Sequence, residues 1–456
     1  MVHGKNIRMK LVWGIVIVAA ALNAAPVRAQ FDSGSDGSDG TLDCAWLVAH
    51  DPNDAYPNGF DCANVTTGCR QLSPCTFTID LSKARDGHWH DTPGDGLGVY
   101  DSEQWAVVYK YTTINVPAYA TVKFKNHRSG AAVVWLAQGA AVIDGEVNLN
   151  GGPGSPVNSL PLPTFSVPGP GGFSGGQHGH SGAVGSSGGQ GPGGGPGGNS
   201  TSSGVYGSGT RAYGNVFVFP LIGGSGGTGT ATGSGGGAGA GAILVASSLS
   251  ITIGTTAGLG ARVSAIAGSG SLGGSGGGIR LVAADSIAGT GSLTAAGTGT
   301  VGRIRVEAPN INLPIANTSP QGSYDNIPGV VFPRLQDNAP TLKLVSIDGI
   351  PAPSDPDAGI LSADVEFTTA TPSTLHIEAT NIDEGVGSPV VRTKVRVEVL
   401  PERGPLIRRC PELFLRPDAS GILDADPTLT FPPGRSEIQL RATWGTAGQI
   451  ACTEQN

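Results

Sequence analysis

The chain has 456 residues, of which 74 are glycine, and a formal net charge of −8 at pH 7. Only 14% of its residues are charged, well below the roughly 25% of ordinary soluble domains. An acidic chain repels the phosphates of nucleic acid, so nucleic-acid partners are not expected.

Residues 1–29 have the pattern of a secretory signal peptide. A basic start is followed by an apolar run over 11–25 and by the small cleavage-site residues Val27 and Ala29. The run is shorter than the roughly 20 residues that a membrane span needs, although an uncleaved anchor is the alternative. We therefore expect a secreted, cell-surface or periplasmic protein that is not an integral membrane protein.

The cysteine content agrees with export. An even number of cysteines in an exported chain predicts disulfides, here among Cys44, Cys62, Cys69, Cys75, Cys410 and Cys452. The simplest pairing has two bridges among the first four and one Cys410–Cys452 bridge. A zinc site is the alternative for the first four, but the tight C-x2-C pairs typical of such sites are absent.

Composition divides the chain into five parts. They are the signal peptide, a cysteine-containing N-terminal region, a β-solenoid-like domain, a linker and an immunoglobulin-like β-sandwich. Their bounds are 1–29, 30–112, 113–314, 315–340 and 341–456, with a glycine-rich insertion at 151–241 inside the third part.

The third part, residues 113–314, contains a repeated strand pattern. Copies begin at Val133, Ile243, Ile279 and Ile304, and each has an alternating strand, a turn, a second short apolar strand and a small-residue exit. One copy cannot bury its apolar face alone, whereas stacked copies form a continuous core. The pattern predicts an all-β fold with a right-handed parallel β-helix or a related solenoid.

The C-terminal part has fewer glycines and stronger alternation of apolar and polar residues. Strands are predicted at 341–345, 364–367, 374–378, 393–399 and 437–444. Several short alternating strands separated by turn residues predict the immunoglobulin-like sandwich.

The glycine-rich insertion has two interpretations. Residues 151–240 hold 33 glycines, and Arg211 is their only charged residue. A flexible tether is one interpretation. The other is an ordered bundle of polyproline-II-like strands, in which missing side chains let backbones approach closely. The apolar island at 216–222 favours partial order.

Several strings resemble a known group of proteins. They are Gly98-Val99-Tyr100-Asp101, Gln104-Trp105-Ala106-Val107-Val108, Pro168-Gly169-Pro170-Gly171-Gly172-Phe173, Gly277-Gly278-Ile279-Arg280-Leu281 and Gly302-Arg303-Ile304-Arg305-Val306. Together they resemble uncharacterised, glycine-rich, exported bacterial proteins with a β-solenoid-like core. The resemblance spans about 36 to 350 and is broken by the cysteine insert at 44–75. It implies export and architecture but no activity.

Two groups of residues are candidate metal ligands. Asp32, Asp36, Asp39 and Asp43 alternate with glycine and serine, and closely spaced carboxylates of this kind can wrap Ca²⁺. His88 and His90 form an H-x-H pair, although two ligands alone do not make a zinc site. Solvated turn residues are the alternative for both groups, and no other cofactor is expected.

No catalytic residues are predicted. Asp144, Glu146, Asp285 and Glu307 are the acidic residues of the repeat, and they are too few to suggest a paired-carboxylate site. We therefore expect a non-enzymatic, adhesin-like or structural surface protein. The alternative is a protein that binds or processes polysaccharide, and its partners would be extracellular polysaccharide or cell-envelope components. Convergence of these carboxylates with Trp46, Trp89, Trp105 or Trp135 in one groove would favour the alternative.

Overall fold

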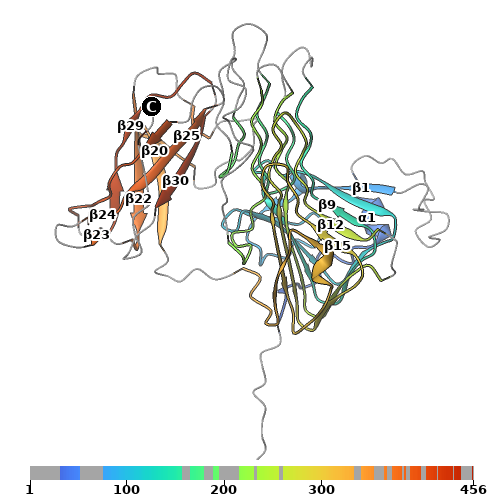
Figure 1. Cartoon of the computed structure of the whole chain (residues 1–456). Coiled ribbons are helices and arrows are strands. Elements are labelled where there is room, and N and C mark those ends of the chain that lie inside the picture. Colours follow the sequence, from blue (N-terminus) through green and yellow to red (C-terminus); the bar gives the residue numbers. More distant parts are fainter. Residues whose placement is uncertain are drawn as a thin grey trace, which may run out of the picture. The chain divides into compact units, whose positions relative to one another are not determined.

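The computed structural model shows an all-β protein (Figure 1). The residues it describes are 31–51, 75–156, 165–178, 188–194, 215–230, 234–255, 260–332, 340–353, 364–366, 372–382, 385–386, 391–401, 407–418, 420–434, 436–442 and 454. Residues 31–456 form one compact unit. Within the described part, helical structure is confined to α1 (Cys44–His50) and the 3-10 turns η1 (Leu81–Lys83) and η2 (Ile315–Asn317).

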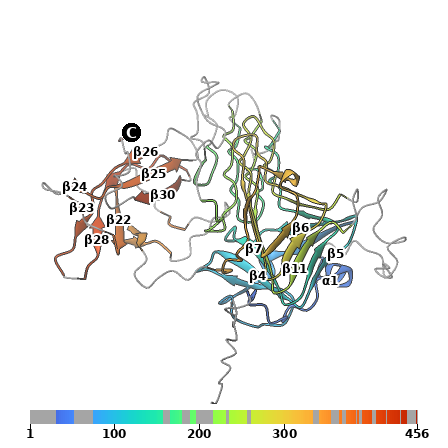
Figure 2. The ribbon, with the colours of Figure 1, turned by 60° about the horizontal axis from the view of Figure 1, so that its bottom comes forward.

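The strands that precede residue 326 belong to three sheets (Figures 1 and 2). The eight-stranded sheet has the order β19 (Ser323–Asp325), β16 (Arg303–Glu307), β13 (Gly278–Ala283), β10 (Ala242–Ser247), β7 (Ala132–Ala137), β4 (Ala106–Tyr111), β3 (Val99–Asp101), β2 (Arg85–Asp86). The six-stranded sheet has the order β1 (Cys75–Asp80), β6 (Ala120–Lys125), β9 (Glu146–Asn148), β12 (Arg262–Ser264), β15 (Ser292–Thr294), β18 (Thr318–Ser319). The five-stranded sheet has the order β17 (Asn310–Asn312), β14 (Ser286–Ala288), β11 (Ser250–Ile253), β8 (Ala141–Ile143), β5 (Ile114–Val116).

Successive strands pass through these sheets in a fixed rotation. β7, β8 and β9 lie in the eight-, five- and six-stranded sheets, and the triplets that begin at β4, β10, β13 and β16 repeat that order. Neighbouring strands are parallel, with the exception of the antiparallel pair β3–β4. Ile243 lies opposite Val133 on one side and Ile279 on the other, so the predicted copies are in register.

The repeat begins one copy earlier than its sequence pattern indicated. β4, β5 and β6 form a full triplet, and β4 pairs with β7 along its whole length. Lys110 stands where the next copy has Leu136, and Tyr111 stands where it has Ala137, which hides the copy in the sequence.

Both faces of the eight-stranded sheet are buried. Val133 and Trp135 point into the main core, where both are fully buried. Val134 and Leu136 belong to a second cluster on the opposite face, which Val218, Leu221 and Val331 cover. A sheet buried on both faces is built from continuous apolar runs, which explains the lack of alternation in these strands.

Helix α1 packs on the N-terminal end of the main core, beside β1 (Figure 1). The carboxylate of Asp43 accepts a hydrogen bond from the Trp46 N–H and so caps the helix. The Trp46 ring then lies edge-on to Tyr109 and Tyr111, with centroid separations of 6.3 and 5.5 Å. A short helix therefore shields rings of β4 that have no earlier repeat copy to cover them.

The described residues of the glycine-rich insertion are ordered and largely buried. They run side by side in green and yellow in Figure 1, and their backbones are joined by hydrogen bonds although they form no sheet. The segment 234–241 bonds to four separate segments, through partners such as Gly152, Phe173, Gly224 and Ser275. A sheet strand has at most two neighbours, so this network extends in three dimensions.

Glycine is required by the packing of this bundle. A Cβ built on Gly239 would lie 1.7 Å from the Gly224 carbonyl oxygen, and one on Gly236 would lie 1.9 Å from that of Gly227. The segment 268–277 takes part in the same way, because a Cβ on Gly268 would meet the Gly152 carbonyl at 1.8 Å. The bundle thus recruits glycines from outside the insertion at 151–241.

The C-terminal strands are antiparallel and have a core of their own. One sheet has the order β21 (Ile350–Pro351), β20 (Thr341–Ile347), β22 (Ser373–Thr380), β28 (Leu423–Ala425), β27 (Phe414–Leu415), and β29 (Thr428–Leu429) also pairs with β22. The others are β26 (Ile407–Arg409), β25 (Val395–Pro401), β30 (Ser436–Ala442) and the pair β23 (Gly385–Val386), β24 (Val391–Arg392). Leu375 and Ile377 of β22 share the core with Val397 of β25. The strand predicted at 364–367 is wrong for 364–366, because 364 and 365 form a bend and 366 is irregular, while 367 lies outside the described residues.

Candidate functional site

The structure brings the two predicted metal-ligand groups together beside β4. An N-terminal arm, residues 31–43, runs along a loop of residues 87–98 that joins β2 to β3. Contacts between arm and loop include Gly34, where a Cβ would lie 2.9 Å from the Trp89 ring. The arm turns every third residue because Gly34, Gly37 and Gly40 have φ values of 77°, 72° and 78°, which favour glycine.

Each aspartate of the arm has a separate local role. Asp32 and Asp36 accept hydrogen bonds from the backbone N–H two residues ahead, at 2.9 Å in both cases. Asp43 caps α1. Asp39 is buried and accepts the N–H of Lys110 at 2.7 Å, and burial raises the pKa of its carboxyl.

Lys110 links the arm to the loop. Its Nζ is buried and donates to Asp36 Oδ2 at 3.3 Å and to the Asp91 carbonyl at 2.6 Å. Burial raises the pKa of Asp36, but the hydrogen bonds from Ser38 and the charge of Lys110 outweigh it and lower that pKa. The ammonium group of Lys110 therefore lies beside Asp36, where the sequence suggested a Ca²⁺ ion.

His88 and His90 lie in the same loop. Their rings are stacked with centroids 4.9 Å apart, and the ring centroids of His90 and Trp89 are 3.7 Å apart. Burial, followed by the charge of His88, lowers the pKa of His90. No group of three or more histidine, cysteine or acidic side chains in the described ranges has metal-ligand geometry. Metal binding by the histidine pair or the four aspartates stays a prediction.

A surface hollow of about 260 Å³ opens beside this loop. Its lining residues are Arg85, Asp86, Asp91, Thr92, Pro93 and Val99. Arg85 forms an ion pair with Asp95 at 2.6 Å, and Arg128 forms one with Asp86 at 3.2 Å. The loop closes tightly because residue 87 is glycine: a Cβ there would lie 2.7 Å from Asp91 Oδ2.

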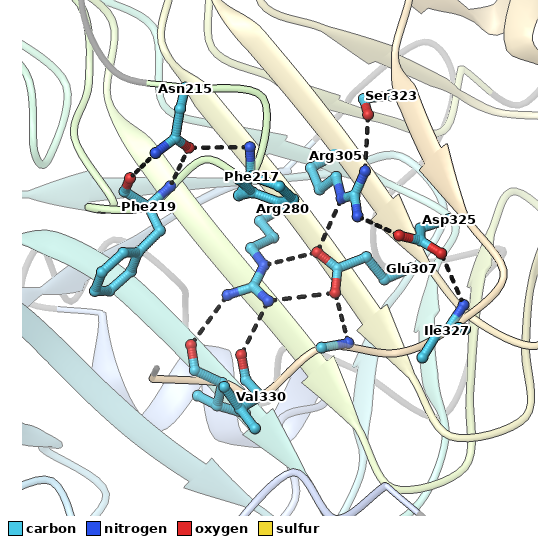
Figure 3. Close-up of polar contacts among 12 residues, drawn as sticks. Asn215, Phe217, Phe219, Arg280, Arg305, Glu307, Ser323, Asp325, Ile327 and Val330 are labelled. Carbon is cyan, nitrogen blue, oxygen red and sulfur yellow. Dashed lines mark hydrogen bonds and ion pairs between the residues drawn. The ribbon is translucent and has the colours of Figure 1, made fainter. Parts of the chain in front are cut away.

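Glu307 lies outside this hollow and is the centre of a buried ion network on β13 and β16 (Figure 3). Its Oε1 lies 3.1 Å from Nε of both Arg280 and Arg305, and its Oε2 accepts the Gly329 N–H at 2.6 Å. Arg305 also pairs with Asp325 at 2.7 Å. The network joins the edge strand β19 and the following residues 329–331 to β13 and β16, so its role is structural.

The remaining acidic residues of the repeat are also separate. Glu146 pairs with Arg262 at 2.7 Å, and Asp144 accepts from the Thr255 N–H at 2.6 Å. Asp285 lies in the turn between β13 and β14 and accepts from the Ser286 hydroxyl. Within the described part of the chain these carboxylates do not form a pair.

The tryptophans do not form a common groove with them. Trp135 is fully buried and Trp46 nearly so, both in the main core. Trp105 donates its indole N–H to the Ser129 carbonyl at 3.0 Å. Trp89 is half-buried and packs edge-on to Phe332 at 5.1 Å. Trp89 belongs to the loop beside the hollow, and Trp46 approaches the same loop at Gly96, where a Cβ would lie 3.3 Å from its Nε1.

Three of the predicted disulfide cysteines lie in the described residues. Cys44, Cys75 and Cys410 are disulfide-bonded. Cys62, Cys69 and Cys452 lie outside the described residues, so the pairing stays a prediction.

Sequence reasoning missed the buried cations. Lys110 and Arg280 each stand alone in a strand without another charged residue, whereas Arg305 shares its strand with Arg303 and Glu307. A single charged residue in a strand that is buried on both faces needs a partner. That pattern could have revealed Lys110 and Arg280 from the sequence.

Comparison of the chain with protein-family models, curated proteins and solved structures finds no match. In the part of the chain that the structure describes, no helix has the length and apolar character needed to cross a bilayer.

Proposed function

We propose that this chain is a non-enzymatic, secreted or cell-surface protein with a structural or adhesin-like role. In this proposal the three parallel sheets form a right-handed β-helix, and the C-terminal sheets form an immunoglobulin-like sandwich. The rotation of strand triplets through three sheets supports the first assignment, and a core shared by two antiparallel sheets supports the second. The resemblance to glycine-rich exported bacterial proteins with a β-solenoid-like core agrees with the first.

The separation of the acidic side chains carries the functional proposal. Most polysaccharide-cleaving sites use two carboxyl groups that face one scissile bond. Here Glu307 forms ion pairs with two arginines, and Glu146 forms one with Arg262. Asp144 accepts a hydrogen bond from the Thr255 N–H. These carboxylates are used for stability, which suits a scaffold better than an enzyme of this kind.

The glycine bundle supports the same conclusion. Backbone hydrogen bonds hold its segments at a spacing that admits no side chain at Gly236 or Gly239. Such packing gives a rigid element without presenting reactive groups. A surface scaffold requires a rigid element of this kind, without reactive side chains.

The proposal is tested with the secreted chain and a panel of neutral and acidic polysaccharides, with and without Ca²⁺. Polymer length and new reducing ends are measured, together with retention of the protein on cells and envelope fractions. Retention with unchanged polymers supports the proposal. Shortened polymers overturn its non-enzymatic part, and absence of retention on every surface overturns the adhesin-like part.

Carbohydrate binding without cleavage is the second candidate function. The observation that favours it is the hollow lined by Arg85, Asp86, Asp91 and Thr92, with exposed imidazoles in the same loop.

A further inference from the structure

We propose that the hollow beside residues 85–99 binds one ring of a neutral sugar. This inference rests on the proposed surface role and names the ligand that such a role would use. It concerns six lining residues, Arg85, Asp86, Asp91, Thr92, Pro93 and Val99, and a volume of about 260 Å³. That volume is slightly below the roughly 300 Å³ at which pockets for drug-sized ligands begin, so a single ring is the appropriate ligand size.

The lining alternates hydrogen-bond donors and acceptors. Arg85 is a donor, Asp86 and Asp91 are acceptors, and the Thr92 hydroxyl can do both. A polyol needs this mixture because each of its hydroxyl groups both donates and accepts. Pro93 adds an apolar contact for the C–H groups of a ring, and the buried side chain of Val99 lies beneath it.

The charges of the lining select a neutral ligand. Two carboxylates and one guanidinium line the hollow, and that guanidinium already pairs with Asp95 at 2.6 Å. Asp86 is likewise paired with Arg128 at 3.2 Å, and Asp91 Oδ2 accepts the His88 N–H at 2.8 Å. An anionic sugar or a phosphate would therefore find no unpaired cation among the six lining residues. The charged side chains are also accessible, since those of Arg85 and Asp86 are 62% and 69% exposed.

The loop that forms the hollow is held in place before any ligand arrives. The Asp91 N–H donates to the His88 carbonyl at 2.8 Å, and Asp91 Oδ2 accepts the His88 N–H at 2.8 Å. Lys110 Nζ fixes the Asp91 carbonyl at 2.6 Å, and Asp101 Oδ2 fixes the Trp89 N–H at 2.8 Å. A site that is already ordered loses less entropy on binding.

The test compares Thr92→Trp, which fills the hollow, with Ser102→Trp, which adds the same side chain at an exposed turn outside the lining. Both variants and the unmodified chain are applied to an array of neutral, acidic and amino-sugar glycans. We expect the unmodified chain and Ser102→Trp to bind neutral glycans, and Thr92→Trp to lose at least tenfold in affinity. Near-UV circular dichroism of all three proteins checks that Thr92→Trp is folded.

Several outcomes would overturn the inference. They are equal binding by both variants, binding restricted to acidic glycans, and an array without any bound glycan. If Thr92→Trp does not fold, Asp86→Asn replaces it, with Arg262→Gln as the control, because Arg262 pairs with Glu146 and neither residue lines the hollow. Polymer cleavage would instead overturn the non-enzymatic proposal and leave the hollow's ligand class unaffected, so the two failures are distinguishable.

Discussion

Glu307 Oε1 and Arg280 Nε lie 3.1 Å apart on neighbouring strands, and both side chains are more than nine-tenths buried. Their burial makes the pair a constraint on the eight-stranded sheet, because removing either partner leaves an uncompensated charge in a medium of low polarity.

Glu307→Gln should lower the free energy of unfolding by about 3–5 kcal/mol, since two buried guanidiniums lose their carboxylate. The measurement is urea denaturation followed by tryptophan fluorescence. Arg128→Gln is the matched control, because it breaks an ion pair whose side chains are both 69% exposed. That control should change stability by about 1 kcal/mol or less. Equal effects in the two variants would contradict a structural role for Glu307.

Gly239→Ala should disrupt the glycine bundle. Its Cβ would lie 1.7 Å from the Gly224 carbonyl oxygen, and backbone atoms cannot move aside as a flexible side chain can. We expect a loss of about 3 kcal/mol or more. Hydrogen exchange of the amides at 223–241 should accelerate in the same variant.

Gly260→Ala is the control for this substitution. Gly260 has a φ of 75°, but no atom lies within 4 Å of the position that its Cβ would take, so only backbone strain of about 1 kcal/mol is added. Because Gly239 has no positive φ, a loss as large as its own in Gly260→Ala would contradict close packing as the reason for the larger expected effect.

His376 on β22 should make the C-terminal sheets more stable in mild acid. A hydrogen bond to Asp426 raises the pKa of His376, opposed by burial, while the charge of Arg416 lowers it. Because the folded pKa is raised, its contribution is fully present below the unfolded value of about 6.5 and is lost as pH rises through the folded value. The groups that contact the ring are Asp426, Glu378 and Arg416.

NMR titration of the His376 ring provides the measurement. Asp426→Asn should lower the pKa of His376, and Arg416→Gln should raise it further. Shifts of the same sign in both variants would contradict this account of the cluster.

Asp43→Ala should loosen helix α1, because the carboxylate accepts the Trp46 N–H at 2.9 Å. Loss of an N-cap of this type costs about 1 kcal/mol. Increased quenching of Trp46 fluorescence by iodide should accompany the loss. Asp32→Ala serves as the control, since Asp32 is exposed and far from the helix in the chain; an equal effect there would rule out capping as the cause.

Strand positions were more predictable than the candidate site. The copies at Val133, Ile243, Ile279 and Ile304 were visible because identical environments in stacked parallel strands select similar residues. The copy at Ala106 was hidden because its rings pack against α1, which is a different environment from that of the later copies.

The candidate site depends on contacts that the sequence does not encode locally. Lys110 lies 74 residues from Asp36 along the chain, and the loop that carries Asp91 is placed by a two-residue strand. The order of the glycine bundle was likewise undecided, because glycine composition is shared by flexible tethers and by tightly packed backbones.

The described glycine bundle carries one titratable side chain, that of His178, within a network of amide hydrogen bonds. Its cohesion therefore does not depend on ionisation, on counter-ions or on the dielectric screening that weakens ion pairs in brine. At the secreted or cell-surface location that we propose, acidity and salinity would change without the buffering of a cytoplasm. An element with so little charge would keep one shape through such changes, while the ion pairs elsewhere in the chain respond to them.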